Sequence, residues 1–330
     1  MSNILRDIGN ALNPFAQRGP VPQNVNRGMS TKCLTSHLGT KGAGKTTADC
    51  LLTLAARTLQ QQLPGFYMDI DDRNSTIMRD VSNLQRGHFP PKTKAFDSYA
   101  HQYACTMWWD GPWGKKSTTL NNVDLAGEDF MAVNQYQFDK PDDMASSQAM
   151  RLVQYAMMSD IFILDAPASR ALLFENDVQI EREDEDIAFD PDVNLASITG
   201  SIFNKRKQMR KPIKGVLLFI TKADMIKSYV QQKHKWDIFD SAADRLAFVN
   251  QYFPFTSMKL KALSGWSPKT KVMVLPMFID TAKNPDGSVK RWETGDDAGN
   301  PVIEIDQQTR LPSFGSGFCV QAINFLGQFA

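Results

Sequence analysis

The stretch HLGTKGAGKTT, residues 37 to 47, decides the fold of this chain. An apolar run, KCLTSHL, ends at Gly39, a glycine-rich turn follows, and helical spacing begins around Thr46. Gly42 and Gly44 let the backbone turn its N–H groups inward around phosphate oxygens, because no Cβ stands in the way. A helix that starts here adds the positive end of its dipole. The stretch therefore predicts a phosphate-binding loop between a strand and a helix.

The residue types in this loop indicate the ligand. Lys45 is placed to reach the β- and γ-phosphates of a nucleotide, and the Thr46 hydroxyl is placed to bind Mg²⁺. The nucleotide contacts predicted in the loop are Gly39, Thr40, Lys41, Gly42, Ala43, Gly44, Lys45, Thr46 and Thr47.

The overall composition narrows the class of protein. The 330 residues include 37 Lys and Arg against 36 Asp and Glu, and 42% are hydrophobic. This balance is typical of a globular domain and favours neither nucleic-acid binding nor disorder. The four cysteines fall at no metal-like or disulfide-like spacing, and no apolar run reaches the length of a membrane span. We expect a cytoplasmic protein.

The first 30 residues divide into a short amphipathic helix and a linker rich in Pro, Gly and Asn. The apolar face of the helix consists of Ile4, Leu5, Ile8, Leu12 and Phe15. Docking of this helix onto its own domain or onto a partner protein is the simpler interpretation. Membrane contact is the weaker alternative, because Arg6 is the only basic residue of the helix.

From residue 32 onward, short apolar runs alternate with helical stretches, which predicts a largely parallel sheet covered by helices. The strand runs are 32–38, 161–167, 215–224 and 271–279, and the helical stretches are 45–62, 144–158, 197–209, 225–251 and 316–328. YACTMWW and STTLNNVDLAG are joined by DGPWGKK, which predicts an antiparallel hairpin. We expect a three-layer α/β fold with one antiparallel hairpin strand and helices on both faces. One domain, residues 31–330, would carry insertions at about 66–92, 175–212 and 284–312.

Two apolar runs lead to an aspartate that could hold the metal ion. Asp124, in VDLAGED, can bind Mg²⁺ through a water while Gly127 turns its backbone N–H toward a γ-phosphate. Asp165, in IFILDAP, ends an apolar run, a form that RecA- or AAA-type ATPases use. Ala166 and Pro167 follow Asp165, however, where such an ATPase usually has an acidic base. The chemistry favours Asp124.

A later run, GVLLFITKAD, supplies Thr221, Lys222 and Asp224 at the end of a buried strand. A carboxylate at Asp224 can accept two hydrogen bonds from N1–H and the exocyclic amine of guanine, whereas adenine offers no such pair of donors. An unpaired buried carboxylate is costly, and that cost rejects the wrong base. This run therefore favours a guanine nucleotide.

In this order, the motifs resemble the Ras-like, translation-factor-related (TRAFAC) class of P-loop GTPases over most of residues 32–330. GTKGAGKT is similar to the first motif of that class, DLAG to the third, TKAD to the fourth and DTAK, residues 280–283, to the fifth. The hairpin also fits, because the class pairs that strand antiparallel with its neighbour. The resemblance implies that Thr281, Ala282 and Lys283 contact the guanine, with the backbone around Ala282 at O6 and the stem of Lys222 over the base.

The second motif of this class requires a Thr on the loop before the hairpin, and GHFPPKTKAFDSYA supplies Thr93. The resemblance then implies Mg²⁺ held by Thr46, Thr93 and Asp124. The long stretch before Thr93, together with FPPKT and DLAGED, also resembles the bacterial double-GTPase group of prokaryotic regulatory and conflict systems.

Lys45, Thr93 and Glu128 are the residues implied in GTP hydrolysis. Glu128 stands where many members of the class have Gln, and an ionised carboxylate would repel both hydroxide and the γ-phosphate. We therefore expect slow intrinsic hydrolysis, well below ~1 per second. Lys41 either adds a stabilising cation or points to solvent.

Three functions remain open. The chain is a GTP- and Mg²⁺-dependent switch read by a protein partner, a nucleotide-stabilised structural subunit of a larger assembly, or a P-loop ATPase that uses Asp165. The acidic run 175–192 and the basic run 204–214 are read as solvated segments, with a charged docking patch as the alternative.

Overall fold

The computed structural model of the chain describes residues 31–40, 42–71, 76–91, 101–111, 114–124, 156–173 and 190–329. Its strands are β1 (Thr31–Gly39), β2 (Phe66–Asp71), β3 (His101–Gly111), β4 (Gly114–Asp124), β5 (Ile161–Pro167), β6 (Gly215–Thr221) and β7 (Lys271–Met277). Its helices are α2 (Lys45–Gln62), α3 (Thr76–Gln85), α6 (Arg170–Leu173), α7 (Pro191–Gln208), η1 (Ala223–Ile226), α8 (Lys227–His234), α9 (Ala242–Tyr252), α10 (Pro254–Trp266) and α11 (Ser316–Gly327).

The strands form one seven-stranded sheet in the order β2-β3-β4-β1-β5-β6-β7. β1 pairs in parallel with β4 and β5, and β6 pairs in parallel with β5 and β7. β3 runs antiparallel to both of its neighbours, β2 and β4. The predicted fold class, a mostly parallel sheet with one antiparallel hairpin strand, is confirmed. β2 was not predicted, because its FYMDID run lacks the long apolar character of the central strands.

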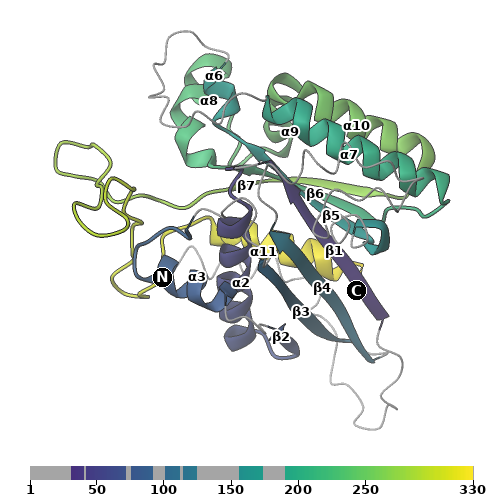
Figure 1. The fold of residues 1–330 in the computed structure, drawn as a ribbon, viewed down its shortest axis with the longest axis horizontal. Helices are drawn as coiled ribbons and strands as arrows, with labels where there is room; N and C mark the ends of the chain where they lie inside the picture. The colour runs from purple at the N-terminus through teal and green to yellow at the C-terminus, as the bar shows by residue number, and fades with distance from the viewer. Residues whose placement is uncertain are drawn as a thin grey trace.

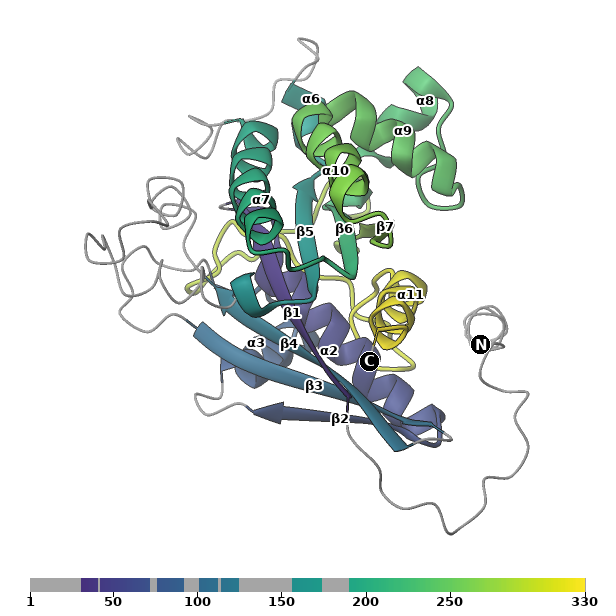
Figure 2. The same cartoon turned by 90° about the vertical axis from the view of Figure 1, so that its right-hand side faces the viewer.

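Helices cover both faces of this sheet (Figures 1 and 2). Phe162 and Leu164 of β5 contribute to one core with α7, α9 and α10. Ile161 and Ile163 of the same strand contribute to the other core with α2, α3 and α11. Every residue of β5 and β6 is buried, which explains why their sequences are continuous apolar runs instead of alternating ones.

The region after β6 differs from the sequence-based expectation. The single helix expected over residues 225–251 is wrong, because the chain forms η1, α8 and α9 instead. Lys235 ends α8 with a φ of 60°, and Ser241 starts α9 by accepting a hydrogen bond from the N–H of Asp244. α10 was not predicted, and its Pro254 occupies the first turn, where a missing N–H costs nothing.

Between β7 and α11 the chain makes a long excursion, residues 278–315, held by short antiparallel bridges. The excursion reaches the end of α3, where Ile303 N–H donates to the carbonyl of Gly87 at 3.0 Å. His88 stacks on Trp292 with ring centroids 4.1 Å apart, and its Nδ1 lies 2.7 Å from Asp297 Oδ2. These contacts hold Gly87 and His88, which follow α3, against the excursion.

No helix in the described part of the chain is both long enough and apolar enough to cross a bilayer.

Candidate nucleotide-binding site

The phosphate-binding loop runs from the end of β1 to the start of α2. Gly42 and Gly44 have φ angles of 68° and 96°, which residues with a Cβ adopt only with strain. The N–H of Ala43 donates to the carbonyl of Thr40 at 3.1 Å and closes the loop. α2 begins at Lys45 with no side-chain cap and no acidic residue in its first turn. Its positive dipole end and its first N–H groups are thus presented at this loop.

The ammonium group of Lys45 is turned into the loop. Its Nζ donates to the carbonyls of Gly39 at 3.0 Å and Thr40 at 3.3 Å, and the residue is only 6% exposed. A buried ammonium needs strongly polar or anionic partners, because burying an isolated charge is costly. Thr46 and Thr47 follow in the first turn of α2 and are half-buried. Positive charge and hydroxyl groups are therefore gathered at one place, as an oxyanion ligand requires.

The end of β6 is tied directly to this loop. The Thr221 hydroxyl donates to the carbonyl of Ala43 at 2.5 Å, and both residues are buried. Lys222 follows with a φ of 56°, a conformation that residues with a Cβ rarely adopt and that often marks a functional position. η1 starts at the next residue and contains Asp224. TKAD and GTKGAGKT, far apart in the sequence, thus lie side by side.

Asp224 lies close to the segment that contains the fifth motif. Burial raises the pKa of the Asp224 carboxyl, and the charge of Asp280 raises it further, against the lowering effects of a backbone hydrogen bond and of Lys222 and Lys283. The backbone of this second segment is fixed, since the Ala282 N–H donates to the carbonyl of Val302 at 2.9 Å. Asp224 is a partly desolvated carboxyl that a ligand with two N–H donors would stabilise.

Both candidate metal-binding aspartates flank the end of β1. On one side, Asp165 pairs directly with Gly39. On the other side, the parallel register between β1 and β4 pairs Ser36 with Asn121, and the same spacing carries Asp124, three residues on, to the level of Gly39. Both aspartates therefore come from strands that end at the loop.

A buried charged cluster lies beneath the loop, and no sequence motif indicated it. His37 Nδ1 is 2.8 Å from Asp49 Oδ1, and His37 Nε2 is 3.0 Å from Asp165 Oδ1. A protonated imidazole has two N–H donors, which suit two ring nitrogens that both face ionised carboxylates. Burial alone would lower the pKa of His37, but the charges of Asp165 and Asp49 outweigh burial and raise it to about 10. The available signals were the four-residue spacing of Lys45 and Asp49 on α2 and the shared strand face of His37 and Gly39.

The buried cluster explains the environment of the Asp165 side chain. Its side chain is fully buried, and Oδ2 has no hydrogen-bond partner among the described residues. A Cβ added to Gly39 would lie 3.3 Å from that oxygen, so Oδ2 faces the backbone of the loop from below. Burial raises the pKa of Asp165, against the opposing charges of His37 and Lys45. The Asp165 carboxyl thus contacts His37 with one oxygen and faces the backbone of the loop with the other.

Several predicted site residues lie outside the described part of the chain: Lys41, Thr93, Gly127 and Glu128. Of Asp124, only the backbone is described. Within the described residues, no three His, Cys, Asp or Glu side chains form a metal site. Mg²⁺ at nucleotide sites usually has one or two protein oxygen ligands beside waters and phosphates. A hydroxyl such as that of Thr46, in the first turn of α2, and a carboxylate such as that of Asp124, the last residue of β4, are the donor types that fit it.

A separate shallow hollow of about 630 Å³ lies between α2, β2 and α3. It is lined by Arg57, Gln60, Gln61, Met68, Ile70 and Met78. It contains none of the predicted nucleotide contacts, and its one charged side chain, Arg57, already donates to Met78 Sδ at 3.0 Å.

Among solved structures, the chain is similar to Sup35 and to the GTPase-like domain of Ski7. Sup35 complexed with GMPPNP is 14% identical, with a TM-score of 0.31, over 78% of this chain and 40% of that chain. The Ski7 GTPase-like domain of S. cerevisiae bound to GTP is 15% identical, with a TM-score of 0.34, over 81% of this chain and 47% of that chain. The chain thus spans less than half the length of either protein. No protein-family model and no curated protein matches the sequence.

Proposed function

We propose that this chain binds a guanine nucleotide with Mg²⁺ and acts as a slowly hydrolysing switch that a protein partner reads. The observation that carries the proposal is the hydrogen bond from Thr221 to the carbonyl of Ala43. It joins the loop suited to phosphates to the strand end that leads to Asp224. In the proposal, this bond holds the phosphate-binding loop and the base-selective carboxyl in a fixed position relative to each other.

The phosphate end of the site rests on Lys45. Its ammonium donates to two carbonyl groups of its own loop. Phosphate oxygens compete well for such an ammonium, because they carry a negative charge that carbonyl oxygens lack. In the proposal Thr46 and Asp124 hold Mg²⁺, which neutralises charge on the β- and γ-phosphates, and the loops around Thr93 and Gly127 respond to the γ-phosphate.

The base end rests on Asp224. Guanine donates from N1–H and from its exocyclic amine, so an ionised carboxylate satisfies both donors. Burial already raises the pKa of this carboxyl, so a ligand that donates two hydrogen bonds favours its ionised form and lowers that pKa again. The ATPase alternative is disfavoured, because Asp165 is fully buried and bonded to His37 below the loop.

The first experiment tests whether Asp224 selects the base of the nucleotide. Asp224→Asn replaces one acceptor by a donor, which matches the N1–H and C2 carbonyl of xanthine instead of guanine. We expect GDP affinity to fall about 10²-fold or more and XDP affinity to rise, since hydrogen bonds to charged groups contribute about 1.5–3 kcal/mol each. Asp296→Asn, at an exposed position in the 278–315 excursion, is the matched control. Unchanged GDP binding by Asp224→Asn, or tighter ATP than GTP binding by the natural chain, would contradict the proposal.

A second experiment tests the role of Glu128 in slow GTP hydrolysis. In the proposal, Glu128→Gln removes a repulsive carboxylate from the attacking water and speeds single-turnover phosphate release. Equal or slower release would remove Glu128 from the slow-hydrolysis argument while leaving nucleotide binding intact. A cytoplasmic setting agrees with four buried cysteines that form no disulfide. Membership of the double-GTPase group stays a prediction.

A further inference from the structure

The sheet edge opposite the nucleotide site is built from strand starts and helix ends. Ile161, Gly215 and Lys271 stand side by side in register at the starts of β5, β6 and β7. α7 and α10 run in the same direction, because the Asp192 carboxylate at the start of α7 accepts hydrogen bonds from the N–H groups of Phe255 and Thr256 at the start of α10. Both helices therefore end at this edge (Figure 2).

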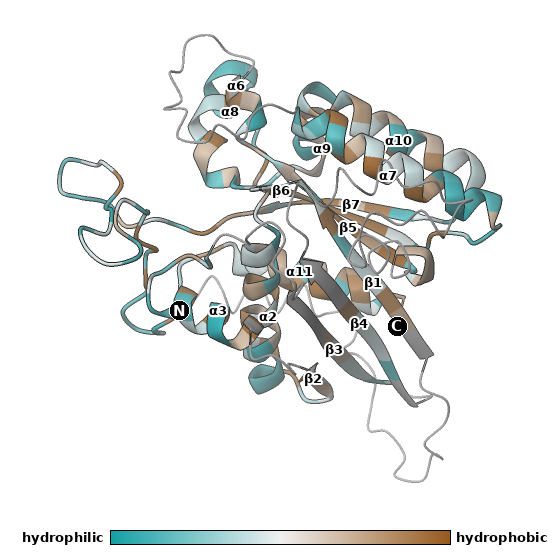
Figure 3. Ribbon diagram, viewed as in Figure 1, coloured by the Kyte–Doolittle hydropathy of each residue, from teal (hydrophilic) through white to brown (hydrophobic). Residues whose placement is uncertain are grey.

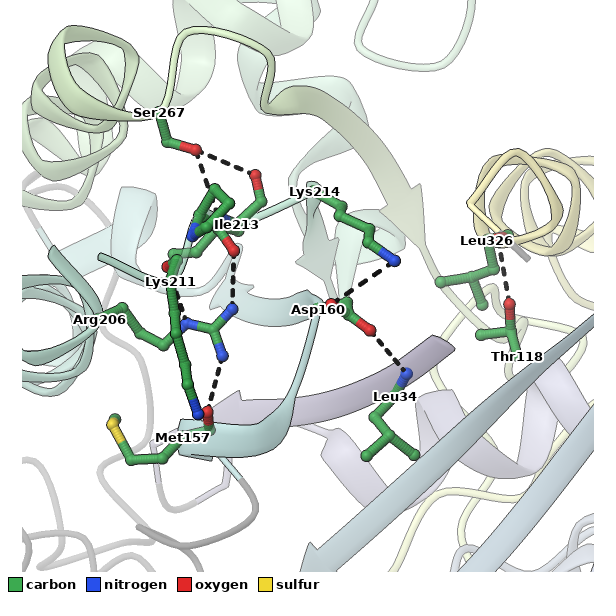
Figure 4. Close-up of polar contacts among 11 residues, drawn as sticks. Leu34, Thr118, Met157, Asp160, Arg206, Lys211, Ile213, Lys214, Ser267 and Leu326 are labelled. Atoms are coloured by element: carbon green, nitrogen blue, oxygen red, sulfur yellow. Dashed lines mark hydrogen bonds and ion pairs between the residues drawn. The ribbon is translucent and has the colours of Figure 1, made fainter. Parts of the chain in front are cut away.

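Basic residues dominate this edge. Residues 193–223 and 245–279 contain no Asp or Glu. The exposed cations where these stretches meet the edge are Lys207, Arg210, Lys211, Lys214, Lys269 and Lys271, which we call the basic edge. Asp160 is an acid described beside them, and its carboxylate lies 3.6 Å from Lys214 Nζ while it accepts from the Leu34 N–H at 3.4 Å (Figure 4). Cations outnumber acids here, although the whole chain carries a net charge of only +1.

The basic edge is a preformed platform. The buried guanidinium of Arg206 donates to the carbonyls of Met157, Lys211 and Pro212 at 2.7, 3.2 and 2.7 Å (Figure 4). Those bonds fix the turn after α7.

The adjoining turn after α10 is fixed as well. Ser267 both accepts from the N–H and donates to the carbonyl of Ile213, at 3.2 Å each. The exposed lysines are thus carried on ordered backbone, so binding a partner would order little more than their side chains.

Apolar side chains are interspersed with these charges. Met158, Met209 and Val272 are 53%, 43% and 44% exposed. Figure 3 shows the ends of α7 and α10 as a mixture of hydrophilic and hydrophobic residues. Five of the six cations of the basic edge are lysines, compact point charges that suit a diffuse negative surface better than bidentate recognition.

The acidic run of the chain is anchored away from this edge. α7 is 18 residues long, so its two ends lie roughly 27 Å apart. The segment between Leu173 and Asp190 leaves and re-enters the described structure at the nucleotide edge. To reach the basic edge and return, a loop of this length would need to be almost fully extended both ways. The described part of the acidic run, residues 190–192, lies at the opposite end of α7 and leaves the basic edge open to another anionic surface.

We propose that the basic edge docks on an anionic lipid surface, with the three apolar side chains entering the headgroup region. Each basic residue near such a surface strengthens binding by about fivefold, and short apolar side chains add a contribution that salt does not screen. Binding in this orientation leaves the nucleotide site facing away from the lipid. The segment before Thr31 also enters the domain at the start of β1, on this same side.

The test is co-sedimentation of the full chain with vesicles of phosphatidylcholine alone or with 30% phosphatidylserine, at low and high salt. We expect binding to the mixed vesicles only, weakened by salt. Lys207→Glu/Lys211→Glu/Lys269→Glu should reduce binding about 100-fold. The matched control, Lys233→Glu/Lys235→Glu/Lys290→Glu, makes the same change in net charge at exposed positions off the edge and should stay within about threefold of the natural chain. Met158→Ser/Met209→Ser should remove most of the binding that survives high salt.

Several results would overturn the proposal. One is the absence of binding to mixed vesicles, and another is an equal loss in both lysine triples, which would make net charge the cause. A third is that deletion of residues 1–30 abolishes binding while the basic-edge triple does not affect it. Tighter binding to an oligonucleotide duplex than to vesicles, lost in the basic-edge triple, would reassign this face to nucleic acid. Thermal unfolding midpoints of all variants distinguish loss of binding from loss of folding.

Discussion

His37 Nε2 lies 3.0 Å from Asp165 Oδ1, beneath the backbone of the phosphate-binding loop. With Asp49 on its other ring nitrogen, His37 joins β1, β5 and α2 by charge. The residues that we propose to contact a phosphate are thus supported from below by this buried cluster. Removing one member of such a cluster leaves an uncompensated charge and is strongly destabilising.

This cluster predicts how stability depends on pH. The pKa of His37 is raised to about 10 by Asp165 and Asp49, against burial, so the folded chain keeps this proton in a range where the unfolded chain loses it. The contribution of the protonated His37 to stability is fully present below the unfolded pKa of about 6.5. It is lost as the pH rises toward the folded pKa of about 10. We expect the free energy of unfolding, measured in urea, to fall between pH 6.5 and 8.5 by up to about 1.4 kcal/mol per pH unit. His37→Gln should flatten this slope, and an unchanged slope would contradict a protonated His37.

The close packing of Gly39 predicts a steric effect. A Cβ at this position would lie 3.0 Å from Asp165 Cβ and 3.1 Å from Lys45 Cγ. Gly39→Ala should therefore cost about 1–3 kcal/mol of stability by overpacking and should weaken nucleotide binding by displacing Lys45. Gly265→Ala is the comparison, because a Cβ there meets no neighbouring atom and the position lies in α10, outside the predicted nucleotide contacts. Equal nucleotide affinity in both variants would show that Lys45 has not moved.

The bond between Thr221 and Ala43 predicts a difference between two small substitutions. Thr221→Val keeps the shape but leaves the Ala43 carbonyl without its buried donor, at a cost of about 1–3 kcal/mol. Thr221→Ser keeps the hydroxyl and should retain most of the stability. If the two motifs act as one site, GDP affinity measured by calorimetry should fall in the Val variant and stay close to the natural value in the Ser variant. A lower GDP affinity in the Ser variant than in the Val variant would show that the two motifs do not act as one site.

The contact of His88 with Asp297 predicts an energetic link between the 278–315 excursion and the end of α3. Their side chains are 30% and 34% exposed, so the pair is screened by solvent, and we expect a coupling of about 0.5–1 kcal/mol in a double-mutant cycle with alanine. His88→Ala should cost more than Asp297→Ala, because it also removes the stack on Trp292. Purely additive effects of the two substitutions on the urea midpoint would show that the contact contributes nothing.

The parts of the fold that follow from short-range rules were predictable. α2 spans 45–62 as its spacing indicates, because the glycine turn, the helix start and the apolar face lie within one continuous segment. The hairpin of β3 and β4 followed from turn residues between two β-rich runs. The break between α8 and α9 was missed, because Lys235 takes a left-handed conformation that its residue type does not favour. α10 was missed because its apolar residues do not all face the core: Phe255 and Met258 are 46% and 56% exposed, whereas Leu263 is buried.

The sequence by itself determined the local chemistry of this protein: a backbone loop that can surround phosphates, a lysine at the helix start and a carboxyl suited to guanine. Only the tertiary structure decided that Thr221 meets Ala43, that His37 lies between Asp49 and Asp165, and that the cations of two distant segments form one edge. Each of these depends on contacts between residues far apart in the chain. Hydrogen bonds, desolvation and charge depend on distance in space, which local sequence patterns do not specify.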